Sequence, residues 1–279
     1  MNRARTRAVG QQVLLYLLLA IGAVFAAFPV VWMLSSSFKS NTAIFAFPPQ
    51  LIDDTFSFKA YREVLTDPAV LGYFANSYLV AIAVTVLTVV TSILTAFALS
   101  RYVFAGKRIF SSVVFGVQGV PPITLLIPFF GIMAVLGLYD TLPGLILAHV
   151  VITLPYSIVM MTAYFDGLPI ELDEAAKLDG AGPLRILWRV LTPIALPGIA
   201  AVAIYTFMVS WNEYLFALSL TRADSHRTIP VGIQLLMSQY NIQWQEIMAV
   251  SILGSLPVLI LFLVFQRYFI GGLSAGAVK

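Results

Sequence analysis

Cysteine is absent from this chain, and charged residues are scarce. Without cysteine there can be no disulfide and no thiolate metal site, so redox chemistry gives no indication of the cell compartment. Only 10% of the residues are charged and 60% are hydrophobic, whereas soluble domains carry about 25% charged residues. The formal net charge of +3 is small and dispersed, which argues against nucleic-acid binding. This composition predicts an integral membrane protein.

The phosphate-binding loop GxxxxGK[ST] is also missing. Gly106 and Lys107 are followed by Arg108, and no glycine stands five residues before Gly106. The metalloprotease motif HExxH is absent as well. We therefore expect no catalytic residue, no metal site and no cofactor bound by this chain.

Six apolar segments are long enough to cross a membrane, since a helix needs roughly 20 apolar residues to span a core of about 30 Å. They cover about 12–34, 71–99, 109–135, 143–163, 194–220 and 247–266. The first follows three arginines, as a signal peptide would, but its apolar run exceeds the roughly 7–15 residues of a signal sequence. We expect a retained helix here, with a cleaved signal peptide as the alternative.

The basic residues are distributed unequally between the two sides that six spans define. Eleven of the 16 Lys and Arg fall on the side of the two termini, the link 101–108 and the long loop 165–193, and five fall on the other. Because cytoplasmic loops carry the excess of positive charge, both termini are predicted to be cytoplasmic. The segments 36–70 and 221–246 are then external.

Several of the spans carry internal prolines, with three in the third span and one each in the fourth, fifth and sixth. They are Pro121, Pro122, Pro128, Pro155, Pro197 and Pro257. Each proline removes a backbone donor and tends to kink a helix, although proline is also commoner in membrane helices than in soluble ones. The three prolines of the third span favour a bent helix that lines a cavity.

The loop 165–193 is a polar island between two apolar spans. Proline suits a helix start and glycine suits the residue after a helix end, so Pro169, Gly180 and Pro183 predict two short helices that meet at a turn. In the first helix Leu172, Ala175, Ala176 and Leu178 are the apolar positions, and the charged residues face elsewhere. Such a loop at a membrane surface is expected to contact another protein.

This loop resembles the signature of permease subunits of binding-protein-dependent ABC importers. The matching residues are EAAKLDG at Glu174 to Gly180 and VLTP at Val190 to Pro193, where Thr192 replaces the usual leucine. The stretches 74–108, 211–221 and 271–279 are similar to the carbohydrate-uptake branch of this permease family, and specifically to the G-type subunit of maltose importers. The resemblance implies an all-α, polytopic type I permease fold with six transmembrane helices in a single domain, 1–279.

The resemblance also implies the partners of the chain and the residues that contact them. A second permease subunit, a cytoplasmic ATPase dimer that uses ATP and Mg, and an external sugar-binding protein would act with it in the membrane of a bacterium or archaeon. The first helix of the island would be a coupling helix, with Glu174 supplying charge, small Ala175 and Ala176 allowing close approach to the ATPase, and Gly180 making the turn. The C-terminal tail would lie between the two ATPase chains. The expected coupling residues are Glu174, Ala175, Ala176, Asp179, Gly180, Pro193 and Lys279.

Polar and aromatic residues within the spans are candidates for the substrate path, because polar groups are costly in lipid. They are Asn76, Gln118, His149, Tyr156, Trp211, Asn212 and Glu213. Amides and carboxylates suit sugar hydroxyls, and aromatic faces suit the apolar side of a sugar ring. The alternative role for His149 and Gln118 is an interhelical hydrogen bond. The alternative for Glu213 is that its carboxylate is simply exposed to water near the external end of the span.

Two other classes remain open at this stage. An ion-coupled secondary transporter or channel would need charged residues in mid-span, and only Glu213, near one end, is available. An intramembrane enzyme would need a nucleophile and a base, and the sequence identifies no partner for His149. Because the spans offer essentially no Lys or Arg to hold an anion, an uncharged sugar is favoured over a phosphorylated one.

Overall fold

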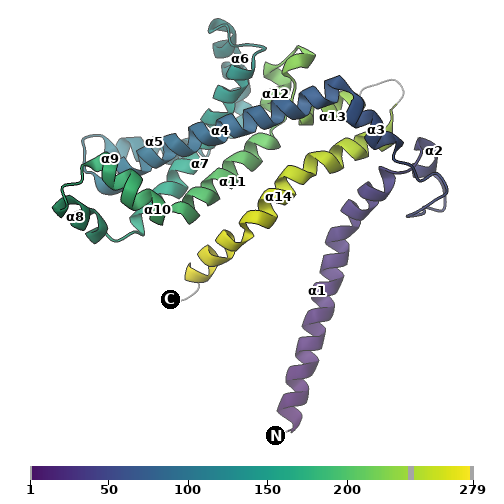
Figure 1. Cartoon of the computed structure of the whole chain (residues 1–279), viewed down its shortest axis with the longest axis horizontal. Helices are drawn as coiled ribbons and strands as arrows, with labels where there is room; N and C mark the ends of the chain where they lie inside the picture. The colour runs from purple at the N-terminus through teal and green to yellow at the C-terminus, as the bar shows by residue number, and fades with distance from the viewer. Residues whose placement is uncertain (1, 238–241, 277–279) are drawn as a thin grey trace. The chain divides into compact units, whose positions relative to one another are not determined.

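A computed structural model describes residues 2–237 and 242–276, and every regular element in this part of the chain is a helix (Figure 1). The all-α fold class is therefore confirmed. The chain forms two compact units. One comprises Met1–Asp67 with Ile233–Ser255, and the other Pro68–Gly232 with Leu256–Lys279.

The first unit contains α1 (Asn2–Ser36), α2 (Asn41–Ile44) and α3 (Lys59–Thr66), the end of α13 (Ile229–Met237) and the start of α14 (Trp244–Gly276). Most apolar side chains of α1 are exposed, as suits a helix that contacts lipid. Asn41 joins α2 to the start of α14. Its Nδ2 donates to the carbonyl oxygen of Ile242 at 2.8 Å, and its Oδ1 accepts from the backbone N–H of Trp244 at 2.8 Å.

The predicted external segment 36–70 is ordered by an aromatic cluster. The ring centroid of Phe38 lies 4.7 Å from that of Phe56, 5.2 Å from that of Phe58 and 5.0 Å from that of Tyr61. Such offset and edge contacts are favourable beyond the area that they bury. This segment is therefore a small packed structure.

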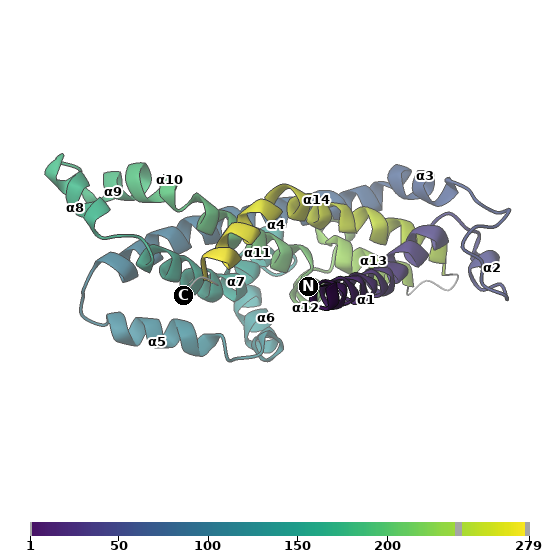
Figure 2. The same ribbon diagram turned by 90° about the horizontal axis from the view of Figure 1, so that it is seen from below.

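The second unit is built on three helices: α4 (Pro68–Arg101), α7 (Leu142–Asp166) and α11 (Leu196–Trp211), which lie side by side (Figures 1 and 2). Buried hydroxyl groups form hydrogen bonds between these helices. Thr88 Oγ1 lies 3.1 Å from Thr153 Oγ1, and Ser157 Oγ lies 3.2 Å from Thr206 Oγ1. Such interhelical hydrogen bonds are common in membrane proteins, where small polar residues also allow close helix approach.

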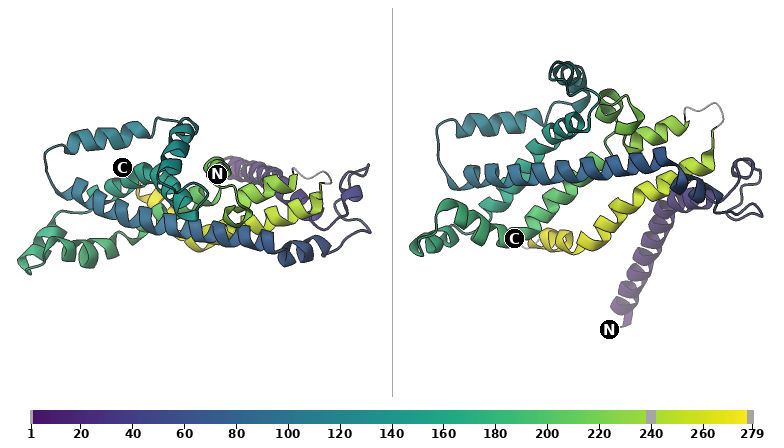
Figure 3. Two further views of the ribbon diagram at one scale, coloured as in Figure 1. Left: turned by 90° about the horizontal axis from the view of Figure 1, so that it is seen from above. Right: turned by 45° about the horizontal axis from the view of Figure 1, so that its top comes forward.

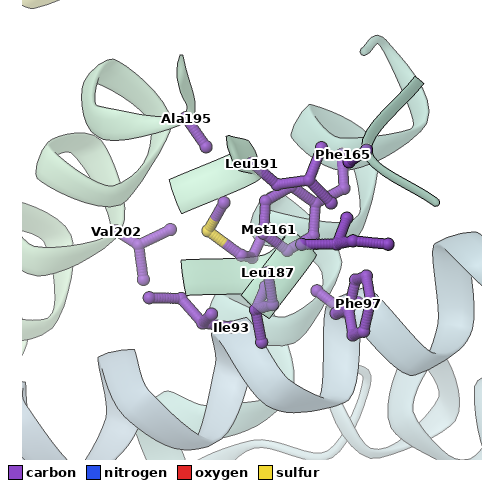
Figure 4. Packing of buried hydrophobic residues seen from close by; sticks show 11 residues of the cluster. Ile93, Phe97, Met161, Phe165, Leu187, Leu191, Ala195 and Val202 are labelled. Atoms are coloured by element: carbon purple, nitrogen blue, oxygen red, sulfur yellow. The ribbon is translucent and has the colours of Figure 1, made fainter. Parts of the chain in front are cut away.

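A buried apolar cluster lies at one end of this bundle (Figure 4). α4 contributes Ile93 and Phe97, and α7 contributes Met161 and Phe165. Leu187 and Leu191 come from the loop that sequence analysis singled out. The cluster thus fixes the predicted cytoplasmic loop to the transmembrane helices.

The third predicted span is sharply bent, as its prolines indicated. It consists of α5 (Lys107–Val117), η1 (Pro122–Leu125) and α6 (Leu126–Val135), with a bend of 103° (Figure 3). Ser111 and Phe115 of α5 line a pocket of about 340 Å³ with residues of α4 and α7. The prediction of a bent helix beside a cavity is consistent with this geometry.

Within residues 2–237 and 242–276, four helices are long and apolar enough to span a membrane, and the number becomes six when each of two bent pairs counts as one span. The four are Gln11–Ser36, Pro68–Arg101, Leu142–Asp166 and Trp244–Phe265. The second bent pair, 183–194 with 196–211, bends by 82°. This pair begins eleven residues before the predicted fifth span, 194–220. The last part of that span is formed by a separate helix, α12 (Leu215–Leu220).

Candidate functional site

The predicted coupling loop begins with α8 (Glu171–Leu178), which lies with α9 (Pro183–Ile186) at one end of the second unit (Figure 2). Gly180 has φ of +74°, and the hydrogen bonds around it form the Schellman arrangement that ends a helix. The Gly180 N–H donates to the Lys177 carbonyl at 3.0 Å, and the Ala181 N–H donates to the Ala176 carbonyl at 2.9 Å. Pro183 is the first residue of α9, as the sequence predicted.

The two faces of α8 differ from the pattern that its sequence suggested. Leu178 is 90% exposed, whereas Asp173 is only 3% exposed. Ala176 is buried in the apolar cluster, so Ala175 is the alanine that remains accessible. The exposed face therefore presents Glu174, Ala175 and Leu178, next to Lys177 and Asp179.

Asp173 is buried because Arg101, the last residue of α4, lies against it. The Arg101 Nε is 2.9 Å from the Asp173 Oδ2. Residues distant in sequence supply this partner, so the pattern of α8 alone could not reveal it.

The second part of the signature forms a π-helical turn, η2 (Leu187–Leu191), followed by α10 (Thr192–Ile194). π turns are rare and occur often at functional sites. Pro193 lies in α10, next to the bend of 82° that leads into α11. Leu187 and Leu191 are fully buried, so this turn anchors the loop.

Lys279 lies outside the residues that the structure describes. The helix α14 continues to Gly276, which is beyond the predicted end of the sixth span near residue 266. The sequence contains one hydrolase-like spacing, Gly-x-Ser-x-Gly, at 272–276. It falls in this helix, whereas that motif requires a strand-to-helix turn, so the spacing indicates no nucleophile.

A second group of candidates surrounds the break between α11, which ends at Trp211, and α12, which begins at Leu215. His149 of α7 is fully buried beside this break. Its Nδ1 lies 2.9 Å from Ser210 Oγ and its Nε2 lies 3.1 Å from Glu213 Oε2. Glu213 also accepts the N–H groups of Phe216 at 2.9 Å and Ala217 at 3.0 Å, at the start of α12.

Through these contacts His149 and Glu213 join α7 to the break. Both nitrogens of the imidazole have partners, and the Glu213 side chain is only 11% exposed. The interhelical hydrogen bond considered for His149 is therefore present. Ser210 and Glu213 as its partners could not be identified from sequence, because α7 and α11 are distant along the chain.

Asn212 is the exposed polar residue at the break. Its Nδ2 donates to the Met208 carbonyl at 2.8 Å. Trp211 is buried between Tyr78, at a ring distance of 4.8 Å, and Phe207, at 5.6 Å. Unwound backbone within a span is found where it lines a cavity or a substrate site.

The remaining path candidates lie apart from this break. Tyr156 is 42% exposed, and its ring lies 4.5 Å from that of Tyr205, a residue that sequence analysis did not select. Asn76 donates to the carbonyl oxygens of Ser225 at 2.8 Å and Arg227 at 2.9 Å. Gln118 donates to the Val114 carbonyl, one turn earlier. In the described part of the chain, no three His, Asp or Glu side chains form a group that could hold a metal ion.

Comparisons with known proteins agree with these features. Residues 88–274 match the family model described as the binding-protein-dependent transport system inner membrane component. The chain is 36% identical over 264 residues to the inner membrane ABC transporter permease protein YcjP of Escherichia coli, covering 94% of each protein. It is 36% identical over 276 residues to the trehalose/maltose transport system permease protein MalG of Thermococcus litoralis, covering 96% of this chain and 99% of that one.

A solved structure supports the same assignment. The fold matches a chain in the crystal structure of a bacterial ABC transporter involved in the import of the acidic polysaccharide alginate, with a TM-score of 0.84 and 27% identity, over 96% of this chain and 99% of that one. The multi-pass membrane helices, the loop signature and these matches lead to one conclusion. The chain belongs to the family of binding-protein-dependent transport system inner membrane components and is an ABC importer permease.

Proposed function

We propose that this chain forms one half of the translocation path for an uncharged sugar, and that a separate cytoplasmic ATPase drives it. The observation that carries this proposal is the geometry of α8. This eight-residue helix is fixed on one face by Asp173 and Ala176, and ends at a left-handed glycine. Its other face exposes Glu174, Ala175 and a largely uncovered Leu178.

An ATPase groove would suit that exposed face. The protruding Leu178 offers apolar area that a partner could remove from water, and a small neighbour such as Ala175 lets a partner approach the helix backbone. The sequence has no phosphate-binding loop, which supports the binding of ATP and Mg by another polypeptide.

The substrate path is proposed at the break between α11 and α12. Asn212 offers an amide for sugar hydroxyls at the break, and the exposed ring of Tyr156, which lies apart from the break on α7, offers an aromatic face elsewhere along the path. The relative from Thermococcus is named for trehalose and maltose, which are uncharged, whereas the alginate importer takes an acidic polymer. We favour an uncharged sugar because the predicted spans have essentially no Lys or Arg within them to hold an anion.

The proposed setting is a bacterial or archaeal cell membrane with both termini in the cytoplasm. A second permease would complete the path, and an external binding protein would deliver the sugar. The charge asymmetry of the loops supports this orientation. The ATPase would then close on ATP at α8 and rock the bundle between inward-open and outward-open forms.

The test is reconstitution with the partner permease, the ATPase and the binding protein. Sugar-stimulated ATP hydrolysis should be present in the wild type and should fall at least about tenfold in Leu178→Asp, since burial of a leucine side chain is worth about 1.5–3 kcal/mol and aspartate loses it. Ile52→Asp is the matched control, because Ile52 is also exposed, at 77%, but lies in the predicted external segment. Uptake driven by an ion gradient without ATP would instead identify a secondary transporter.

A further inference from the structure

A buried ion pair joins the last residue of α4 to α8. Arg101 Nε lies 2.9 Å from Asp173 Oδ2, and the two side chains are only 8% and 5% exposed. The atoms are close but not aligned as a hydrogen bond, so their attraction is ionic. Arg101 Nη2 also donates to the Leu168 carbonyl at 3.1 Å, so one guanidinium holds both α8 and the segment that leads into it.

Asp173 is unusual among the acidic residues of α8. The first turn carries Glu171, Asp173 and Glu174, and the two glutamates are exposed. A buried guanidinium and carboxylate both lose their hydration, and their attraction often does no more than offset that loss. Apolar residues at the two positions could hold the fold as well. Stability is therefore a weak explanation for this pair.

The position of Arg101 suggests a different role. α4 is one continuous helix from Pro68 to Arg101. Near its other end, Asn76 donates to the carbonyl oxygens of Ser225 and Arg227, and Ser77 Oγ accepts from the Ile229 N–H at 2.8 Å. α4 thus connects α8, on the predicted cytoplasmic side, with the loop 225–229 on the predicted external side.

We propose that Arg101 and Asp173 are positioning residues that transmit the movement of α8 to α4. Coupling between distant sites is carried by rigid elements and by the contacts that join them. Ala176 also attaches α8 to the bundle, but through apolar contacts that are not directional. The ion pair gives α8 one fixed partner on α4. This inference rests on the proposed function, since a partner ATPase is what would move α8.

The test uses Asp173→Asn in the reconstituted importer, a variant that keeps the side-chain size and removes the charge. The complex should still bind the ATPase and hydrolyse ATP, but sugar uptake per ATP should fall by about tenfold, because residues along a coupling route modulate it by about 2- to 30-fold. Lys59→Gln is the matched control. It breaks the exposed Lys59–Glu63 pair, whose atoms are 3.6 Å apart, and should leave uptake unchanged.

Two reporter positions separate a positioning role from a structural one. The chain has no cysteine, so a dye can be attached to Glu171→Cys on α8 or to Leu71→Cys near the external end of α4. Both positions are exposed. In the wild type, ATP binding by the ATPase should change the emission of both dyes. In Asp173→Asn the change at 171 should persist, and the change at 71 should disappear.

A normal response at 71 with normal uptake in Asp173→Asn would overturn the proposal. Should that variant fail to insert, Arg101→Met with Asp173→Leu replaces the pair by apolar residues of similar size, a change that buried ion pairs often tolerate. This double variant should insert and remain uncoupled, and wild-type uptake in it would also overturn the proposal. Absence of any ATPase-dependent change at 171 in the wild type would instead contradict the proposed function, and this inference with it.

Discussion

At position 180 the backbone conformation alone limits which residue type can be accommodated. The φ of Gly180 is +74°, and a Cβ added there would meet no atom within 4 Å. The effect of a substitution is therefore conformational rather than steric. We expect Gly180→Val to destabilise the end of α8 by about 1–3 kcal/mol and to misdirect the helix, because β-branched residues disfavour the left-handed region.

Gly182 provides the control for this prediction. It also has open space around its Cβ position, but its φ is −74° and its ψ is 165°, which any residue before a proline adopts readily. Gly182→Val should retain sugar-stimulated ATP hydrolysis, and Gly180→Val should lose it while still inserting into the membrane. Equal activity of the two variants would show that the turn at Gly180 does not direct α8.

Asp140 organises a predicted external loop through one carboxylate oxygen. Oδ1 accepts the N–H groups of Arg222 at 2.8 Å and Ala223 at 3.0 Å, and lies 3.2 Å from His226 Nδ1. The backbone hydrogen bond from Arg222, aided by those from Ala223 and His226, lowers the pKa of Asp140 from its ordinary value of 3.8, although partial burial opposes the shift.

The stability that Asp140 contributes should therefore depend on pH in a defined direction. Because the pKa is lowered in the folded state, the contribution is complete above the ordinary value and is lost as the pH falls through the folded value. Melting temperatures of wild type and Asp140→Asn in detergent should differ at pH 6, and the difference should shrink as the pH falls below the ordinary value of 3.8. Asparagine tolerates the positive φ of 57° at this position, so the backbone is preserved. A constant difference across this range would contradict the assignment.

Sequence reasoning at the residue scale succeeded where a local rule decides the outcome. The turn at Gly180 and the helix start at Pro183 follow from backbone preferences and are confirmed. The faces predicted for α8 were wrong, because burial of Asp173 depends on Arg101, which is distant in sequence. The partners of His149 were missed for the same reason.

Prolines acted differently from one helix to another. The pair Pro121 and Pro122 coincides with the bend of 103°, and Pro197 stands at the start of α11, beside the bend of 82°. Pro155 and Pro257 instead lie inside the continuous helices α7 and α14. Neighbouring helices can satisfy the backbone groups that a proline frees, so a single proline in a span predicts a break poorly.

The contact between α7 and α11 leads to a prediction about packing. A Cβ added to Gly198 would lie 2.4 Å from the Tyr164 ring, with two further ring atoms within 3 Å. Gly198→Ala should therefore destabilise the protein by about 1–3 kcal/mol through overpacking. Gly72→Ala in α4 is the control, because nothing lies within 4 Å of its Cβ position and alanine favours a helix. Thermal unfolding in detergent should show a lower midpoint for Gly198→Ala only.

The hydrophobic pattern predicted the existence and approximate position of the membrane helices better than it predicted the residues at which they begin and end. Four spans correspond to continuous helices, and the third corresponds to a bent pair. The fifth predicted span, 194–220, is formed by α11 and α12, and a bend of 82° separates α11 from the helical turns of the loop before it. Composition identifies apolar length, but it does not show where a bent helix begins.

Orientation in the membrane is the remaining prediction at this scale, and it follows from charge. Eleven of the 16 Lys and Arg lie on the side of the loop 165–193, and the positive-inside bias places that side in the cytoplasm. Single cysteines at Ser57, Ser225 and Arg185 would test this, because all three residues are exposed and the chain has no cysteine of its own. An impermeant maleimide added to intact cells should label positions 57 and 225, and should label position 185 only after the membrane is permeabilised. Labelling of position 185 alone in intact cells would show that the orientation is the opposite of the predicted one. α8 would then lie outside the cell, beyond the reach of a cytoplasmic ATPase.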